Sequence, residues 1–151
     1  MRTPASDLLD RLKLGYQVLA YDEVEKTALE VARKLGIAPS QVYKTLLAAS
    51  GREFALAVVP GDAELSLRSL ARAWSRPAAE MAEPSDITRI TGYVRGSVSP
   101  LGTKRKLPVF LDRSAQGREI AVSAGRRGLE LIIAGDDLCR AAEGTWADLR
   151  R

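Results

Sequence analysis

Residues 42–59 read VYKTLLAASGREFALAVV, two apolar runs separated by a short turn. The runs 42–48 and 53–59 contain β-branched residues and have the length of strands, and Ala49-Ser50-Gly51-Arg52 between them favours a tight reversal. Pro60-Gly61-Asp62 then ends the second run, because proline and glycine do not continue a central strand. This stretch predicts a β-hairpin.

Helices and further strands are predicted on both sides of the hairpin, from capping residues, glycine stops and apolar residues at helical spacing. The predicted helices are 3–15, about 25–36, one capped by Ser66 that contains Trp74, one capped by Ser85 that ends at Gly92, one capped by Asp136 or Asp137 that ends at Ala142, and a short last one that starts at Gly144-Thr145 and contains Trp146. Further strands are predicted at 16–21, 107–111, 119–122 and 129–133.

The order of these elements bounds the fold class. Helices and strands are intermixed, and several strands are close enough in sequence for hairpins, which favours a mixed or mostly antiparallel sheet over a doubly wound one. The 151 residues suit one domain over residues 1–151. No run approaches the roughly 18 apolar residues of a membrane helix, and the N-terminus lacks a signal-peptide pattern. We therefore expect a cytoplasmic protein that does not contact a membrane.

The chain has no histidine and a single cysteine, Cys139. The absence of histidine excludes serine and cysteine triads and the usual zinc sites, because each needs an imidazole as base or ligand. Cys139 lies on an apolar helix face with no base beside it, which favours a core role over that of a nucleophile. We expect no metal site and no cofactor.

Positive charge is concentrated in one part of the sequence. Residues 91–127 contain eight Lys and Arg side chains and two acidic ones, a net charge of +6, whereas the rest of the chain sums to −2. A basic segment on a slightly acidic body favours a polyanionic partner, with phosphates the best match. The alternative is that these charges only serve solubility.

The loop from Gly96 to Gly102, sequence GSVSPLG, is the first candidate site in this basic segment. Its backbone N–H groups and the hydroxyls of Ser97 and Ser99 could meet an anion or a developing oxyanion, and the cations 104–106 follow it. Five residues separate its glycines, so it is not a P-loop, and it lacks the Gly-x-Ser-x-Gly pattern of serine hydrolases. The alternative is an ordinary turn followed by solvated cations.

Lys44 is out of place in the predicted hairpin. In a strand it shares a face with Val42, Leu46 and Ala48, so it points where apolar residues point. A lysine there can be held at the lip of a cavity, where it binds a phosphate or polarises a carbonyl. Alternatively, it protects a strand edge against aggregation, or its amine extends to water.

Seven segments form a pattern when taken together. They are Thr3-Pro4-Ala5, Gln41 to Leu47, Thr91-Gly92-Tyr93, Gly96 to Gly102, Lys104 to Pro108, Val122 to Leu129 and Gly135 to Leu138. In order and spacing they resemble the YbaK/ProX family of aminoacyl-tRNA deacylases. The free-standing YbaK branch, the cysteinyl-tRNA(Pro) deacylases, is more similar than the editing domain inserted in prolyl-tRNA synthetase.

The resemblance implies a fold and a reaction. The fold is an α/β domain with a curved, mixed, mostly antiparallel, barrel-like sheet surrounded by helices. The reaction is trans-editing, the hydrolysis of the ester between a wrong amino acid and tRNA, above all in cysteinyl-tRNA(Pro), where the substrate's own thiol can assist cleavage. The implied partners are the mischarged tRNA and prolyl-tRNA synthetase. The residues themselves leave two alternatives open: a non-catalytic module that binds a nucleotide or the tRNA acceptor end, and a subunit of a synthetase complex.

The resemblance also assigns roles to residues. Lys44 matches the strand lysine that the family needs most for activity and that is thought to hold the phosphate of the terminal adenosine. Gly96 and Ser97 match the loop beside the aminoacyl carbonyl and complete the expected catalytic set. The expected substrate-binding residues are Tyr21, Val98, Ser99, Ser123, Gly125 and Asp137, and the expected RNA-binding residues are Lys104, Arg105, Lys106 and Arg126. The family pattern has a longer acidic segment with a histidine after Tyr21, where this chain has only DEVEK, residues 22–26.

Overall fold

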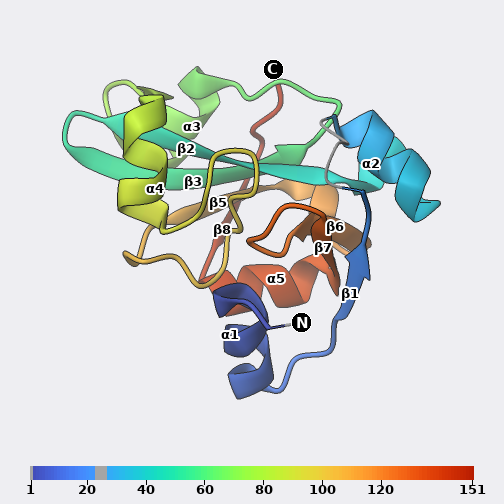
Figure 1. The fold of residues 1–151 in the computed structure, drawn as a ribbon. Helices are drawn as coiled ribbons and strands as arrows, with labels where there is room; N and C mark the ends of the chain where they lie inside the picture. Colours follow the sequence, from blue (N-terminus) through green and yellow to red (C-terminus); the bar gives the residue numbers. More distant parts are fainter. Residues whose placement is uncertain (1, 23–26) are drawn as a thin grey trace.

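The computed structural model describes residues 2–22 and 27–151, so the predicted helix start near Glu25 lies outside the described residues. The helices are α1 (Pro4–Leu12), α2 (Ala28–Leu35), α3 (Leu67–Ala73), α4 (Pro84–Thr91) and α5 (Gly135–Ala142), with short 3-10 turns η1 (Pro39–Gln41) and η2 (Arg113–Ala115). The strands are β1 (Gln17–Ala20), β2 (Tyr43–Ser50), β3 (Glu53–Pro60), β4 (Glu80–Met81), β5 (Val109–Asp112), β6 (Glu119–Ser123), β7 (Leu129–Ala134) and β8 (Thr145–Ala147). Figure 1 shows their arrangement.

The strands form two sheets, one of five strands in the order β4-β2-β3-β5-β8 and one of three in the order β1-β7-β6. The five-stranded sheet is mixed, because β3 and β5, and β5 and β8, pair in parallel. This confirms the mixed α/β class and corrects one detail of the expected barrel. An isolated bridge between Val42 and Ala121 links β6 to the residue before β2, and so narrow a link leaves two sheets instead of a closed barrel.

The predicted hairpin is confirmed, with β2 extending two residues further than expected, to Ser50. Its residues pair from Tyr43 opposite Pro60 to Ser50 opposite Glu53. Gly51 in the turn has a φ of 59°, a left-handed conformation that glycine adopts without strain. Two apolar runs and the turn between them were therefore sufficient to predict this element.

Three apolar clusters hold the layers together. The largest contains one face of each sheet together with residues of α1, α4 and α5, and Leu56, Leu111, Leu131 and Leu138 are fully buried in it. On the other face of the five-stranded sheet, Leu70 and Trp74 cover Ala57 and Phe110. On the other face of the three-stranded sheet, Val31 and Ala32 of α2 pack against Ala121 and Ile132. Each fully buried Leu or Ile side chain contributes roughly 1.5–3 kcal/mol through its removal from water.

Two predicted helix caps are wrong. α4 begins one residue before Ser85, with Glu83 at the N-cap and Pro84 in the first turn. α5 has Ala134 at its N-cap, so neither Asp136 nor Asp137 caps it. Its first residue is Gly135, where a Cβ would lie 2.0 Å from the carbonyl oxygen of Ala115. The close approach of η2 thus sets where α5 begins.

The predicted helix at Gly144 to Trp146 is a strand instead. β8 pairs in parallel with β5, and Trp146 lies opposite Leu111. That pairing joins residues far apart in the sequence, and it overrides the local turn and cap signal at Gly144-Thr145.

Candidate active site

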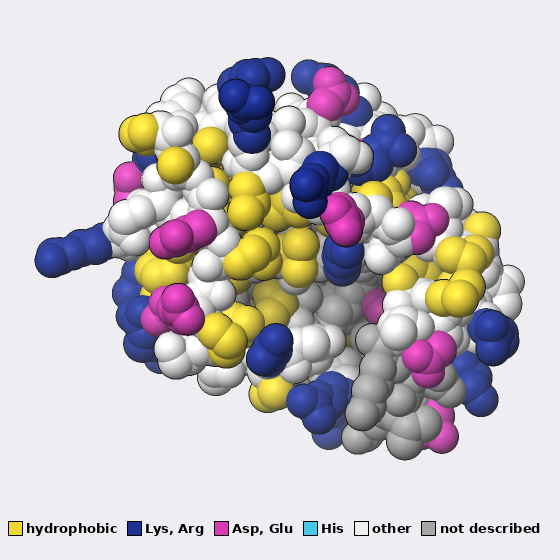
Figure 2. Space-filling model, turned by 90° about the horizontal axis from the view of Figure 1, so that it is seen from above, with side chains coloured by type: hydrophobic (Ala, Val, Ile, Leu, Met, Phe, Trp, Pro, Cys, Tyr) yellow, Lys and Arg dark blue, Asp and Glu magenta, His cyan; other side chains and the backbone are white. Residues whose placement is uncertain are grey.

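A cavity of about 770 Å³ has walls from both sheets. The hairpin strand β2 and the start of α4 contribute one wall, and α2, Ser123 of β6 and Glu130 of β7 contribute another. Figure 2 looks down on the molecule and shows a hollowed surface bordered by apolar side chains and several Lys and Arg side chains. The cavity has the size of a small-ligand site.

An open strand edge forms part of the wall. β4 pairs with β2 only at Ala48 and Ala49, so within the described part of the chain residues 43–47 have a strand, β3, on one side only. The carbonyl of Leu47 accepts a hydrogen bond from the N–H of Ala82, on the β4 side. Alternate residues of an antiparallel strand direct their backbone groups to the same side. The backbone groups of Thr45 are therefore directed toward the cavity.

Lys44 lies in this wall, and its side chain is half-buried. Its neighbour on the same face of β2, Leu46, packs against the cluster under α3 that contains Ala48. Lys44 forms no ion pair with any residue of 2–22 or 27–151. The structure thus places an unpaired ammonium group at the cavity, where it can bind an anion.

Glu130 lies in the wall formed by the three-stranded sheet, and the sequence did not identify it as a site residue. It is 6% exposed, and β7 pairs it with Leu19 on one side and Ser123 on the other. Burial raises the pKa of Glu130 to about 8, so the carboxyl group is largely protonated at neutral pH. A charged residue within the apolar run 129–133 was the available signal, the same one that pointed to Lys44.

Two buried side-chain oxygens in the described part of the chain have no hydrogen-bond partner, Oγ1 of Thr45 and Oε2 of Glu130. Both residues line the cavity. Buried polar atoms are nearly always paired in folded proteins, and each unpaired one costs about 1–3 kcal/mol. Two such atoms at one cavity indicate a place for a polar ligand.

The loop at Gly96 reaches the cavity through some of its predicted residues. Gly96 and Val98 line it, together with Arg95, which the sequence did not identify. The hydroxyl and the N–H of Ser97 both donate to the carbonyl of Val94, at 2.9 Å each. The hydroxyl of Ser99 accepts from the N–H of Leu101 at 3.3 Å. These two hydroxyls therefore hold the shape of the loop, and neither Ser97 nor Ser99 lines the cavity. Of the predicted loop residues, Gly96 and Val98 are those that line it.

The turn that begins at Ser123 supports this loop from the other side. Ser123 lines the cavity, and its hydroxyl accepts from the N–H of Gly125 at 3.0 Å. Gly125 has a φ of 95°, and a Cβ there would lie 2.4 Å from Cε1 of Tyr93. The hydroxyl of Tyr93 in turn donates to the carbonyl of Leu101 at 2.6 Å. Gly125 thus acts through packing and does not line the cavity.

Of the other predicted residues, some line the cavity and some do not. Tyr21 lines the cavity, and its N–H donates to the carbonyl of Gly128 at 2.9 Å. Asp137 lies outside the lining and pairs with Arg140 at 2.9 Å. The predicted RNA-binding residues are exposed and also lie outside the lining, and Lys106 pairs with Glu143. They are Lys104, Arg105, Lys106 and Arg126.

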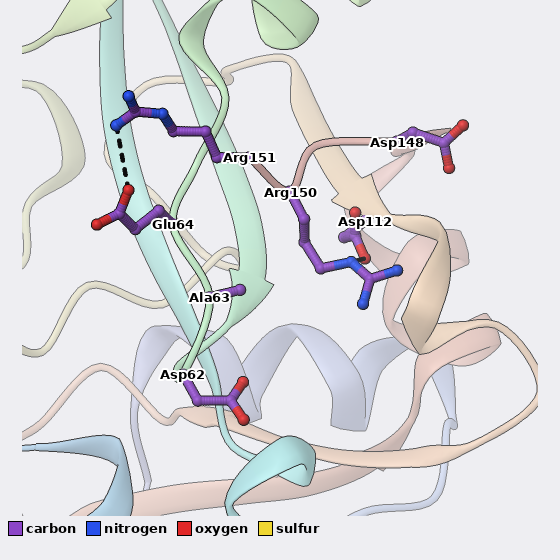
Figure 3. A pocket seen from close by; sticks show the side chains of 7 residues that line it. All are labelled: Asp62, Ala63, Glu64, Asp112, Asp148, Arg150 and Arg151. Atoms are coloured by element: carbon purple, nitrogen blue, oxygen red, sulfur yellow. Dashed lines mark hydrogen bonds and ion pairs between the residues drawn. The ribbon is translucent and has the colours of Figure 1, made fainter.

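A second pocket, of about 760 Å³, lies at the C-terminus (Figure 3). Four of its charged groups are paired with one another, Arg150 with Asp112 at 3.2 Å and Arg151 with Glu64 at 3.1 Å. Asp112 is 1% exposed and also accepts from the N–H of Leu149 at 2.9 Å. These contacts fasten the C-terminal segment to the sheet, and this pocket lacks the unpaired buried atoms of the first.

Replacing Asp112 with alanine is expected to lower the free energy of unfolding by about 3 kcal/mol, because the N–H of Leu149 and the hydroxyl of Ser114 lose a buried acceptor. Urea denaturation measures the change. The control is Asp148→Ala, whose side chain is 90% exposed and which should change stability by less than about 0.5 kcal/mol. Equal stability of the two variants would contradict the role given to Asp112.

Comparisons with known sequences identify related proteins. The family model described as an aminoacyl-tRNA editing domain matches residues 22–141. EbsC of Enterococcus faecalis, assigned as a Cys-tRNA(Pro)/Cys-tRNA(Cys) deacylase, is 34% identical over an alignment of 152 positions that covers 98% of this chain and 93% of EbsC. The proline–tRNA ligase of Bacillus licheniformis is 31% identical over 126 residues, which cover 83% of this chain and 22% of the ligase.

Solved structures share the fold. The hypothetical protein APE2540 superposes with a TM-score of 0.91 at 23% identity, covering 99% of this chain and all of that one. A protein assigned as a trans-editing enzyme for prolyl-tRNA synthetase superposes with a TM-score of 0.87 at 24% identity, covering 100% and 99%. Within the described ranges, no helix is both long and apolar enough to cross a membrane. From the family match and the similarity to EbsC, this chain belongs to the aminoacyl-tRNA editing domain family.

Proposed function

We propose that this chain hydrolyses the ester bond of mischarged aminoacyl-tRNA, with cysteinyl-tRNA(Pro) as its main substrate. The observation that carries the proposal is the cavity. Among the residues that the structure describes, it combines an unpaired lysine, Lys44, with two unpartnered buried oxygens, at Thr45 and Glu130. The name of EbsC and the match to part of a proline–tRNA ligase support this substrate class.

The cavity has the groups needed to hold the charged end of a tRNA. Lys44 and Arg95 are the cations of its described lining, and they suit the phosphate of the terminal adenosine. The backbone at Gly96 and Val98 faces the aminoacyl carbonyl in this arrangement, where N–H groups stabilise developing negative charge. The open edge at Thr45 provides further backbone donors and acceptors along the ester.

The nucleophile comes from the substrate in this proposal. With no histidine in the chain, the usual activation of a serine or cysteine is absent. The thiol of the cysteinyl group attacks its own ester carbonyl, which forms a carbon–sulfur bond and breaks the carbon–oxygen bond to the ribose. The ribose oxygen takes the thiol proton, and water then opens the resulting thiolactone to cysteine.

Recognition of the tRNA needs a partner. The cavity holds only the acceptor end, and a chain of this size has little surface for reading a distant anticodon. Prolyl-tRNA synthetase is the partner that the similarity to the ligases supports, since it already selects tRNA(Pro). The exposed cations Lys104, Arg105, Lys106 and Arg126 serve the acceptor stem in this proposal.

The test is ester release from tRNA charged with cysteine, alanine, serine or threonine, each compared with its rate in buffer. We expect cysteinyl-tRNA to be cleaved fastest and S-methylcysteinyl-tRNA to resist cleavage, because a thioether cannot attack the carbonyl. Binding of charged tRNA without release of any amino acid would indicate that the protein is a binding module and not an enzyme. Rapid cleavage of the S-methylated substrate would reject the thiol mechanism alone.

A further inference from the structure

The charges of the cavity are unequally divided between its two walls. Lys44 lies on β2 and Arg95 on the loop after α4, whereas Glu130, on β7, is the only acidic residue among the described residues of the lining. The aminoacyl end of a tRNA carries phosphate anions and one cation, the α-ammonium group of the amino acid. Its charges therefore complement those of the cavity, with one acid for one ammonium group.

Glu130 has no partner of its own within the described chain. Its Oε2 makes no hydrogen bond. One strand neighbour, Leu19, is apolar, and the other, Ser123, has a hydroxyl that already accepts from the N–H of Gly125. The other polar groups facing the cavity include Tyr43, whose hydroxyl bonds that of Ser114. No ion pair joins Glu130 to Lys44 or Arg95. A carboxyl group this deeply buried requires a partner when it is ionised.

We propose that Glu130 binds the α-ammonium group of the aminoacyl ester, and that the site therefore selects esters with a free α-amino group over N-acylated ones. This inference rests on the proposed function and deepens it. An N-acyl group removes the positive charge and leaves Glu130 without a partner. Sites built around such a polar contact reject analogues that lack it, because the buried group is then left unpaired.

The state of the carboxyl group fits this role. While the site is empty, burial keeps the pKa of Glu130 at about 8, and the neutral acid is the form that burial penalises least. An ammonium group placed against it favours the carboxylate. Lys44 and Arg95 line the same cavity, and their positive charges also favour ionisation of Glu130. A phosphate bound to them offsets this effect.

Binding of a stable analogue tests the inference directly. The probe is 3′-deoxy-3′-(alanylamino)adenosine, an amide that cannot undergo ester cleavage, compared with its N-acetyl form by calorimetry. We expect the wild type to bind the free amine at least about tenfold more tightly, a difference of about 1.4 kcal/mol. Glu130→Gln, which keeps the shape and cannot ionise, should reduce this ratio to near one. Glu119→Gln, an exposed change on the neighbouring strand β6, should leave it unchanged.

Hydrolysis provides the second arm. Aminoacyl-tRNA and N-acetyl-aminoacyl-tRNA are compared, with each rate divided by its rate in buffer, because acetylation itself slows ester hydrolysis. A preference for the free amine that is lost in Glu130→Gln supports the inference. The inference would be overturned if the wild type accelerated both esters equally or bound both analogues equally. It would also be overturned if Glu130→Gln lost activity toward both esters to the same extent. If no ester is accelerated, the proposed function fails, and the analogue binding still decides the role of Glu130.

Discussion

Replacing Lys44 with alanine is expected to lower kcat/KM for cysteinyl-tRNA(Pro) hydrolysis by about 100-fold, a loss of about 2.7 kcal/mol of transition-state stabilisation. Lys44 is the cation held within β2 itself, half-buried at the cavity and without an ion pair to any described residue. Charge-assisted bonds to phosphate are about twice as strong as neutral ones, and more so where water is partly excluded. The measurement is single-turnover ester release with wild type and variant.

Two further variants separate charge from structure. Lys44→Arg keeps the cation on a bulkier group and should retain more activity than alanine. Arg52→Ala removes an exposed cation from the turn of the same hairpin and should leave the rate unchanged. A fully active Lys44→Ala variant would remove Lys44 from the proposed mechanism. A variant that unfolds at a lower urea concentration than wild type would instead indicate a structural role.

The second large effect is a pH dependence of stability caused by Glu130. Its pKa is about 8 in the folded protein, against 4.5 for the group in water, so between these values the folded state holds a proton that the unfolded state has lost. The free energy of unfolding therefore falls as pH rises from about 4.5 to about 8. Each pKa unit corresponds to about 1.4 kcal/mol, so the full difference amounts to several kcal/mol.

Urea denaturation of wild type and Glu130→Gln at pH 5, 6.5 and 8.5 measures this effect. The glutamine cannot ionise, so its stability relative to wild type should increase with pH and be greatest at pH 8.5. Other titrating groups are common to both proteins and cancel in the difference. The exposed Glu119→Gln serves as the control and should follow the wild type. A constant difference between Glu130→Gln and wild type would show that Glu130 is ionised in the folded protein at all three pH values.

The parts of the fold that sequence reasoning predicted are those defined by local signals. The hairpin follows from two apolar runs and a glycine turn, and α1 follows from its Thr3-Pro4 cap, whose side-chain bonds the structure contains. β8 was predicted as a helix because its strand character comes from pairing with β5, a contact that no local pattern encodes. The start of α5 was misplaced for a similar reason, because contact with η2 decides it.

The candidate site shows the same division. Lys44, Tyr21, Gly96, Val98 and Ser123 were identified in the sequence and lie together in the cavity. Asp137 was given a site role on the basis of resemblance and lies elsewhere, paired on its own helix. Glu130 interrupts an apolar run as Lys44 does, but its place at the cavity depends on how β7 lies between β1 and β6 and on which face of that sheet meets the cavity. Both facts arise from tertiary structure.

The isolated bridge between Val42 and Ala121 leaves the two proposed tasks, binding the nucleotide and binding the amino acid, on separate sheets instead of on one continuous sheet. The groups suited to the nucleotide lie on the hairpin side of this joint, and the carboxyl group suited to the amino acid lies on the other. A residue exchange on β6 or β7 can reshape the acyl-facing wall while the register of β2 with β3 is preserved. The same architecture can therefore diverge in amino-acid preference during evolution and keep its means of holding RNA.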